Sequence, residues 1–433
     1  MLKDDLSQNL NGNPFLSPSK HSSNPVNGWL DRLWLLALLA MLVTGSLMFR
    51  SGRYCAYLGT DFRGYYAAAQ IARERGFDHV YERAVQVEYQ SSLLMKCPGT
   101  GAVAPPLQVY MPYLPIYVLV VLPLTYLDFT TSYALWSLLN LIGLIAYLQY
   151  FLRAVGSSIS LKHILQWIVC VPVLSSLALG QMNVLLVICL GEFIVALLHG
   201  RPLRSGVWLG AMLMKPQTLI LILPGLIIGR KNRTLAGFGL GTLAVLVSSL
   251  LVGGLSGVTK SIILAVQFAG PLIQTAASMM NFRALALNLG LVWPAWLAWS
   301  IAICGMVLSS GLVFYLWRRE DAFASSTSII LLTLATLAAT FTVSWHSHFY
   351  LLILLLPLLL FLDSKSILPP SGRWVWIVGP PLLYLLLNLI NPATAREGLG
   401  LGMLALGFGL LVWASNLIIA KNLTIRFCGR PFR

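Results

Sequence analysis

Asp61, in the stretch GTDFRGYY (59–66), is the acid in this sequence best suited to chemistry. It follows the first long apolar run and precedes a helical pattern that ends at Gly76. The next acids stand among arginines, as on a solvated amphipathic surface, and no DxD motif occurs outside the N-terminal tail. A lone carboxylate fits a general base better than a two-metal centre. The alternative is a helix N-cap, whose carboxylate accepts a backbone N–H of the first turn.

Two further groups place ionisable side chains beside apolar runs, where they are costly unless used or paired. His346 and His348, in FTVSWHSHF, point in different directions on a helix, which argues against a chelating pair. Either they are interfacial histidines beside Trp345, or one binds phosphate oxygens or a sugar hydroxyl. Lys215, in LMKPQ, stands in a run that is apolar on both sides, and Pro216 breaks the helix there. This pattern suits an anionic ligand, and the alternative is a lysine that snorkels to an interface.

Other polar side chains are candidates for the lining of a pocket. Arg283, in MMNFRAL, could bind a phosphate through two parallel hydrogen bonds. The amides of GQMNVLL (180–186) could line a cavity or bridge helices. The proline- and tyrosine-rich segment 104–115 would shape a rim at the membrane interface.

The elements that position these residues are predicted to be membrane helices. Hydrophobic residues make up 58% of the 433 residues and charged residues 10%, against about a quarter charged in soluble domains. Apolar runs of roughly 17–25 residues recur without the alternation of a β-barrel. We therefore expect an all-α polytopic membrane protein of about 11–13 transmembrane helices. The candidate spans are 33–49, 110–127, 132–152, 163–179, 181–198, 205–228, 234–252, 299–317, 328–343, 347–362, 374–391 and 399–420, with 261–276 and 284–298 as re-entrant or interfacial segments.

The charge pattern predicts an orientation. The net charge of +15 comes from short basic clusters between apolar runs, which is the positive-inside pattern rather than a sign of nucleic-acid binding. We expect a disordered cytoplasmic tail (1–32), a single membrane domain (33–420) and a basic cytoplasmic tail (421–433). The segments 50–109, 253–298 and 344–348 then share the external face. If HGRPLR (199–204) is cytoplasmic, MKPQ (214–217) must lie in a broken or hairpin helix.

Two other patterns bear on the organisation of the chain. Cys55 and Cys97 flank the external segment 50–109 and are candidates for a disulfide if that segment faces an oxidising exterior. No repeat of 20–50 residues is apparent and the two halves do not match, which weakens the case for a transporter built from repeats.

With these residues identified, the chain resembles glycosyltransferase family 87, polyprenyl-phosphate-sugar-dependent mannosyltransferases of the GT-C superfamily. The matching segments occur in order between residues 59 and 348. They are DFRGYYAAA followed by VYE, then YMPYLP, GQMNVLL, MKPQ, MNFRAL and SWHSH. The family's histidine motif often reads SW-x-H-H. Here Ser347 replaces the first of the paired histidines and only His348 matches.

The resemblance implies a helical bundle whose large external loop (50–109) carries interfacial helices and the catalytic aspartate, Asp61. Its implied activity is inverting transfer of a hexose, mannose first, from a polyprenyl-phosphate donor to a glycolipid or glycan acceptor without a metal or other cofactor. The implied setting is the plasma membrane, with the active site outside and both termini in the cytoplasm. The residues expected at the donor phosphate are Lys215, Arg283 and His348, and those expected in the substrate pocket are Tyr65, Tyr66, Tyr113, Gln181, Asn183, Gln217, Asn281, Trp345 and His346.

Three other functions are compatible with such a chain. A secondary transporter would use ionisable residues near the bilayer midplane, where Glu192 and Lys215 are the candidates. A flippase or a ligase for lipid-linked glycans would share the anionic-lipid site but need a larger and more basic cavity. A structural scaffold would leave Asp61, Lys215 and His348 without a role.

Overall fold

The fold of the computed structural model is helical. The structure describes residues 34–43, 45–46, 58–93, 109–268, 276–391 and 393–428, and within these ranges it contains helices and no strand. The predicted all-α class of membrane protein is therefore confirmed. The proposed partners Cys55 and Cys97 lie outside the described residues.

Five helices in the described part of the chain are long and apolar enough to cross a bilayer. They are α6 (Phe129–Ala154), α12 (Asn232–Phe268), α14 (Ala295–Trp317), α15 (Ser326–Val343) and α19 (Ala395–Cys428). Two further spans are bent pairs, by 72° between α7 (Leu161–Ile168) and α8 (Val171–Leu179) and by 41° between α17 (Pro370–Ile377) and α18 (Gly379–Ile390). Since each apolar stretch is matched to the thickness of the hydrocarbon core, the chain is a multi-pass membrane protein.

Several predicted spans are shorter or broken helices in the structure. The apolar helix α9 (Asn183–Leu198) has 16 residues. Prolines at helix starts divide the others because proline removes a backbone donor. Segment 110–127 forms α5 (Pro115–Val118) and the 3-10 helix η3 (Leu122–Tyr126). Segment 205–228 forms α10 (Pro202–Ala211), the 3-10 helices η4 (Met212–Met214) and η5 (Pro216–Leu219), and α11 (Ile222–Ile228). Segment 347–362 forms the 3-10 helix η8 (Phe349–Leu355) and α16 (Leu356–Ser364).

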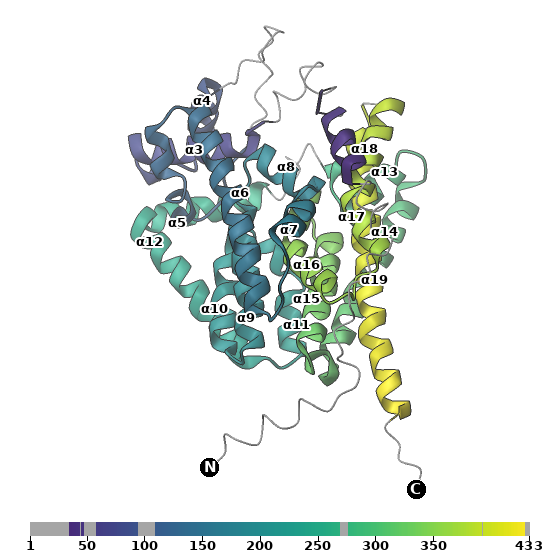
Figure 1. Cartoon of the computed structure of the whole chain (residues 1–433). Helices are drawn as coiled ribbons and strands as arrows, with labels where there is room; N and C mark the ends of the chain where they lie inside the picture. The colour runs from purple at the N-terminus through teal and green to yellow at the C-terminus, as the bar shows by residue number, and fades with distance from the viewer. Residues whose placement is uncertain are drawn as a thin grey trace, which may run out of the picture.

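The remaining elements cap the two ends of the bundle. Segment 58–93 forms α3 (Thr60–Glu74), η2 (Phe77–His79) and α4 (Arg83–Ser92), which lie at the upper end in Figure 1 together with α13 (Phe282–Leu289). Between α12 and α13 lies η6 (Ala276–Ser278), and η7 (Glu320–Phe323) joins α14 to α15. Helix α11, the last residues of α14 and η7 lie at the lower end. The bundle thus brings α3 and α13, which are far apart in sequence, to the same end.

Small residues allow the closest helix contact in the bundle, between α10 and α12. A Cβ atom added at Gly206 would lie 1.9 Å from the backbone oxygen of Thr234, and one added at Gly210 would lie 2.5 Å from backbone atoms of Gly241 and its neighbour. Since apolar side chains gain little from leaving lipid, membrane helices associate through such close packing of small residues. This packing fixes α10, and with it the break that follows, against a long spanning helix.

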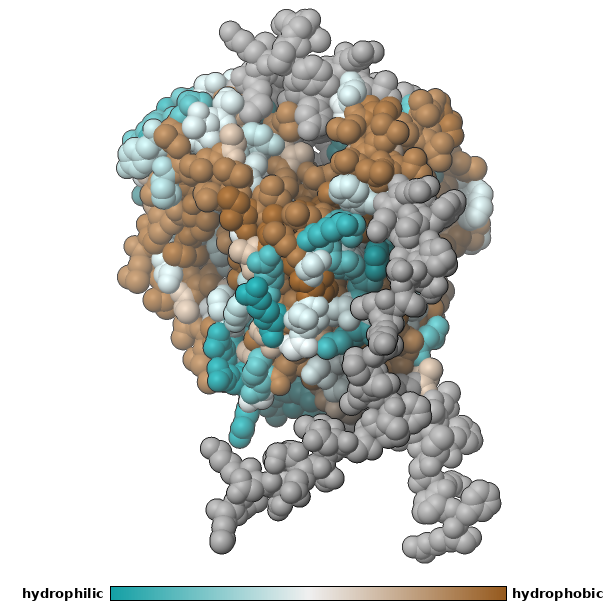
Figure 2. Space-filling model, viewed as in Figure 1, coloured by the Kyte–Doolittle hydropathy of each residue, from teal (hydrophilic) through white to brown (hydrophobic). Residues whose placement is uncertain are grey.

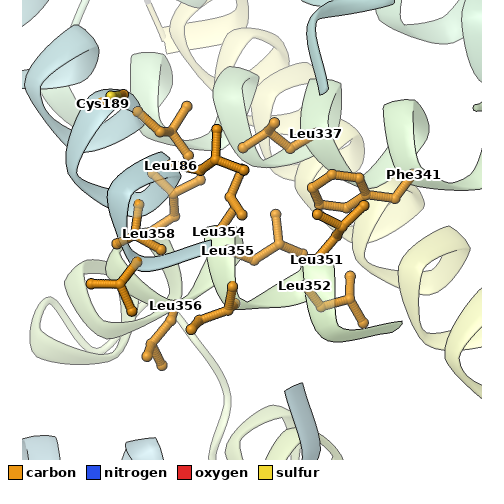
Figure 3. Packing of buried hydrophobic residues seen from close by; sticks show 14 of the residues in the cluster. Leu186, Cys189, Leu337, Phe341, Leu351, Leu352, Leu354, Leu355, Leu356 and Leu358 are labelled. Carbon is orange, nitrogen blue, oxygen red and sulfur yellow. The ribbon is translucent and has the colours of Figure 1, made fainter. Parts of the chain in front are cut away.

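A core of buried leucines lies beneath the upper end. Leucines of η8 and α16 interdigitate with α9 and α15, as Figure 3 shows for Leu186, Leu337, Phe341 and the leucines from Leu351 to Leu358. By contrast, the outer surface is widely apolar, as Figure 2 shows, and Leu251 and Leu291 are more than 80% exposed. An apolar surface of this extent fits contact with lipid rather than water.

A buried carboxylate joins three elements of the bundle. Asp363 of α16 is 5% exposed. Its oxygens accept hydrogen bonds from the indole of Trp167 (3.0 Å) and the guanidinium of Arg373 (3.0 Å), and its Oδ2 lies 2.5 Å from Nε2 of His163. Because a buried carboxylate needs such partners, this contact holds α7, α16 and α17 together.

Replacing that carboxylate is expected to destabilise the fold. Asp363→Ala should lower the free energy of unfolding by roughly 2–3 kcal/mol, because it removes several charge-assisted hydrogen bonds and leaves the buried indole of Trp167 without this acceptor. Thermal or denaturant unfolding in detergent micelles measures the effect. The matched control is Glu88→Ala, which removes an exposed partner of Arg75 and should change stability little. Equal melting of the two variants would contradict the prediction.

Candidate functional site

Asp61 lies in the first turn of α3, and its carboxylate does not cap that helix. The N-cap is Gly59, with φ 63°, and the helix has no side-chain cap. The backbone N–H of Gly59 instead donates to the oxygen of Ala178 at 2.8 Å, which fixes the start of α3 against the end of α8. The predicted helix end is confirmed, since Gly76 follows the C-cap with φ 90°. The carboxylate of Asp61 is therefore available for other partners.

A tight turn between α8 and α9 presents Gln181 to Asp61. Gly180 has φ 71°, and a Cβ atom there would lie 2.5 Å from Cβ of Phe62, so no side chain fits. The N–H of Gln181 donates to the oxygen of Ser176 at 2.8 Å, which closes the end of α8. The indole of Trp136 donates to the oxygen of Gly180 at 2.9 Å. Helix α6 and α3 thus hold this turn from both sides.

Gln181 joins the carboxylate of Asp61 and the ammonium group of Lys215 in one buried network. Its amide nitrogen donates to Oδ2 of Asp61, and its Oε1 accepts from Nζ of Lys215 at 2.6 Å and from the hydroxyl of Tyr65 at 3.1 Å. Nζ of Lys215 also donates to Oδ1 of Asn183 at 2.8 Å. Lys215 is 4% exposed, which excludes the snorkelling alternative. The break between η4 and η5 turns the lysine inward, and MKPQ lies where the helix is broken rather than within a plain span.

Two tyrosines extend the network from the α3 side. The hydroxyls of Tyr65 and Tyr113 lie 3.4 Å apart, and the hydroxyl of Tyr81 donates to the backbone oxygen of Tyr113 at 2.8 Å. Segment 109–114 is in turn bound to α4, since Gln90 exchanges hydrogen bonds with the backbone of Val109. The predicted rim segment accordingly reaches Asp61 through Tyr65.

The surroundings of Asp61 suit a base that works near neutral pH. Burial raises the pKa of its carboxyl from 3.8 to about 6, while the charge of Lys215, the hydrogen bond from Gln181 and the charge of Arg396 lower it. The cost of removing water from the carboxylate thus exceeds the gain from two cations. A base of this pKa is ionised at pH 7 and still basic enough to take a proton.

The two histidines lie beside this network. Their rings meet edge to face, with centroids 5.1 Å apart, and His348 stacks on Tyr350 at 5.2 Å. Nζ of Lys215 lies 5.3 Å from the centroid of the same Tyr350 ring. Burial, followed by the charges of Lys215 and Arg283, lowers the pKa of His346 to about 4. A neutral imidazole at this position suits a sugar hydroxyl better than a phosphate.

Arg283 and Trp345 form a separate stack at the same end. The guanidinium lies 4.2 Å from the centroid of the Trp345 ring, and Trp299 stacks near Trp345 at 6.2 Å. Asn281 caps α13, since its Oδ1 accepts from the N–H of Ala284 at 2.9 Å and its amide donates to the oxygen of Ser344 at 2.9 Å. Asn281 therefore ties α13 to segment 344–348 rather than pointing an amide at Asp61.

The structure brings some of the predicted site residues together around Asp61 and leaves others apart. Tyr66 turns away, because its hydroxyl donates to the oxygen of Leu127 at 2.7 Å and its ring packs on Phe129. No hydrogen bond within the described ranges joins Gln217 to the network. The residues that the structure joins around Asp61 are Tyr65, Tyr113, Gln181, Asn183 and Lys215, with His346 and His348 next to them through Tyr350.

Two residues of this site are not predicted from the sequence. Tyr350 lies between His348 and Lys215, and the charge of Arg396, in the first turn of α19, acts on Asp61. Tyrosine is common at membrane interfaces, so Tyr350 carries no signal of its own. The only cue to Arg396 is its place in the short segment between the candidate spans 374–391 and 399–420.

No three His, Cys, Asp or Glu side chains converge as metal ligands within the described part of the chain. Metal-independent activity stays a prediction, to be tested by assaying transfer in the presence of chelator.

The comparisons with known proteins give one family. The model of glycosyltransferase family 87 matches residues 110–340, more than half of the chain. The matched range includes Gln181, Asn183 and Lys215, while Asp61 and segment 344–348 lie outside it. No curated protein and no solved structure gives a significant match.

Proposed function

The chain belongs to glycosyltransferase family 87, and from this we propose that it transfers a hexose from a polyprenyl-phosphate donor to a lipid-linked or glycan acceptor. Mannose is the first candidate for the sugar. Transfer would take place at the outer face of the plasma membrane, with both termini in the cytoplasm. Asp61 would act as the general base.

The observation that carries this proposal is the bridge of Gln181 between Asp61 and Lys215. Glycosyl transfer from a phosphate needs a base for the acceptor hydroxyl and positive charge for the departing phosphate. A carboxylate and an ammonium, both held by one buried amide, meet these two needs within a single site. Their place at the end of a membrane bundle would let a lipid tail stay in the bilayer while the sugar enters the site.

The residues suggest a direct displacement. The acceptor oxygen would give its proton to the carboxylate of Asp61 and form a bond to the anomeric carbon. The bond from that carbon to the phosphate oxygen would break on the opposite side, and polyprenyl phosphate would leave with the electron pair. One base and one displacement invert the anomeric configuration, whereas retention would call for a second carboxylate. Lys215 would stabilise the phosphate, with Arg283 and His348 as further donors to it.

The transporter alternative loses its main support in the structure. Glu192, the acid inside an apolar helix, accepts a hydrogen bond from Arg204 at 3.1 Å and from the hydroxyl of Tyr147 at 3.5 Å. A carboxylate bound in this way serves the packing of α6, α9 and α10. Lys215, the other candidate, is held by the amides beside Asp61.

A donor assay tests the proposal. Purified protein in nanodiscs would receive radiolabelled polyprenyl-phosphate-mannose, polyprenyl-phosphate-glucose or GDP-mannose, each with membrane lipid extract from the host as acceptor. We expect label to move into a new product from a polyprenyl-phosphate sugar and not from the nucleotide sugar. Transfer from GDP-mannose alone would overturn the proposed donor class. In a parallel assay in sealed proteoliposomes, movement of label across the bilayer without a new product would favour a transporter or flippase.

A further inference from the structure

A cavity lies at the end of the bundle opposite Asp61. It has a volume of about 580 Å³ and is lined by the end of α11, the turn that leads into α12, the end of α14 and η7. These elements meet at the lower end in Figure 1, whereas α3 lies at the upper end. The volume falls in the range of small-molecule sites, roughly 300–1,000 Å³. The proposed transfer reaction makes no use of this cavity.

Basic side chains line the cavity from two sides. Arg230 and Lys231 come from the turn between α11 and α12, and Arg318 and Arg319 from the turn between α14 and η7. Over segments 229–233 and 318–321 the sequence has five basic residues and two acidic residues, so a positive balance remains when the acids are counted. Converging guanidinium and ammonium groups are the usual recognition element for a phosphate.

Another wall of the cavity is aromatic, formed by Trp317 and Phe323. The Trp317 side chain is buried, and its indole donates to the hydroxyl of Thr336 at 2.9 Å. It lies flat on α11, where a Cβ atom at Gly225 would come within 2.6 Å of the ring. Nζ of Lys231 stands 3.5 Å from the ring centroid of Phe323, on the same rim. The cavity is therefore preformed, and it pairs cations with apolar surface.

The backbone at the mouth supports a dedicated role for Arg230. Its φ is 54°, in the left-handed region where glycine or asparagine is usual. Its N–H donates to the oxygen of Ile227 at 3.0 Å, and that of Lys231 donates to the oxygen of Leu226 at 2.9 Å, so the residue ends α11. An arginine at a position that favours glycine is unexpected for a simple helix end. Beside it, Ile227 is 63% exposed and offers apolar surface to the bilayer.

We propose that this cavity binds the phosphate headgroup of an anionic membrane lipid, in the leaflet opposite the Asp61 site. Arg230, Lys231 and Arg318 would hold the phosphate. Arg319, whose guanidinium donates to the hydroxyl of Tyr315 at 2.8 Å, would add positive charge beside it. Ile227 and the aromatic wall would contact the glycerol and upper acyl chains. Basic cavities between spanning helices bind anionic headgroups in this way. A soluble phosphate would contact the basic side chains but not the apolar wall. A lipid would contact both, which favours a lipid as the source of the bound phosphate.

Native mass spectrometry of the full chain in detergent micelles tests the proposal without an activity readout. The protein would be titrated with dioleoyl phosphatidylglycerol and, in parallel, dioleoyl phosphatidylcholine. The double variant Arg230→Gln/Arg318→Gln removes two exposed charges of the cavity. The control, Arg153→Gln/Arg201→Gln, removes two exposed arginines at the same end but outside the cavity. Gel filtration checks that each variant is folded, and the single Arg318→Gln replaces the double variant if that variant aggregates.

Wild type should bind phosphatidylglycerol in preference to phosphatidylcholine. Each charge removed should weaken binding about fivefold, so the cavity variant should lose roughly 25-fold while the control stays near wild type. An equal loss in both double variants would reduce the effect to general surface charge and overturn the proposal. Displacement of the lipid by glycerol 3-phosphate at similar concentration would show a site for soluble phosphates and would also overturn it.

Discussion

Asp61→Asn is expected to lower sugar transfer by roughly 10²–10⁴, the usual contribution of a general base. The amide keeps the shape of the side chain and can still bond to Gln181 after a flip of either group, but it cannot accept the acceptor's proton. Binding of the polyprenyl-phosphate donor should change little, because the lost function lies in the reacting step. The loss should therefore appear in kcat rather than in KM.

Single-turnover transfer from labelled donor measures this effect, with donor binding followed in parallel. The matched control is Asp78→Asn, which neutralises an exposed acid at the same end of the bundle. Near-normal turnover by Asp61→Asn would remove Asp61 from the reaction. Loss of both turnover and donor binding would instead indicate a part in holding the substrate.

The pH profile of the wild type should follow the same carboxyl. Burial raises its pKa to about 6, and the base works only in the ionised form, so transfer should fall about tenfold per pH unit below pH 6 and level off above it. This acidic limb should be absent from the residual activity of Asp61→Asn. If the acidic limb of the wild-type rate profile lies near pH 4, then substrate binding returns the pKa of the Asp61 carboxyl to its ordinary value, or another group titrates.

Lys215→Gln is expected to lower transfer by roughly 10²–10³, the scale of removing one preorganised donor from a developing negative charge. It should also change the pH profile in a known direction. The lysine's charge lowers the pKa of Asp61, so its removal should raise that pKa and move the acidic limb to higher pH. A lysine whose charge does not act on Asp61 would lower the rate without moving the limb.

The measurement is a set of rate profiles between pH 5 and 8.5 for wild type and variant. Lys260→Gln is the matched control, since Lys260 stands at the same end and pairs with Glu82 at 3.4 Å, away from the site. The limb of the control should coincide with that of the wild type. An unshifted limb in Lys215→Gln would refute the coupling between the two charges, even if the rate falls.

Because Gln181 touches both groups, the two substitutions should not act independently. The hydrogen bonds of its amide and carbonyl fix the distance between the carboxylate of Asp61 and the ammonium of Lys215. The double variant should consequently lose less than the product of the single losses.

The amino-acid sequence by itself determined the fold class, the multi-pass character and the principal ionisable residues. Apolar runs of spanning length admit only helices, because lipid offers backbone groups no partner. Lys215 stood out for the same reason, since a cation between apolar runs is expensive unless it is used. The break at Pro216 also followed from local chemistry, because proline cannot continue the hydrogen-bonding of a helix.

Only the tertiary structure decided which side chains meet. Tyr65 and Tyr66 looked equivalent in sequence, but neighbours on a helix point about 100° apart, so one reaches Gln181 and the other packs on Phe129. The bridge by Gln181 depends on Gly180, whose turn is set by Phe62 and Trp136 from distant helices. Tyr350 enters the site through the stacking of His348 and the approach of Lys215, two contacts that no local pattern encodes. Long-range packing of this kind is a property of the assembled bundle, and it converts separate costly residues into one site.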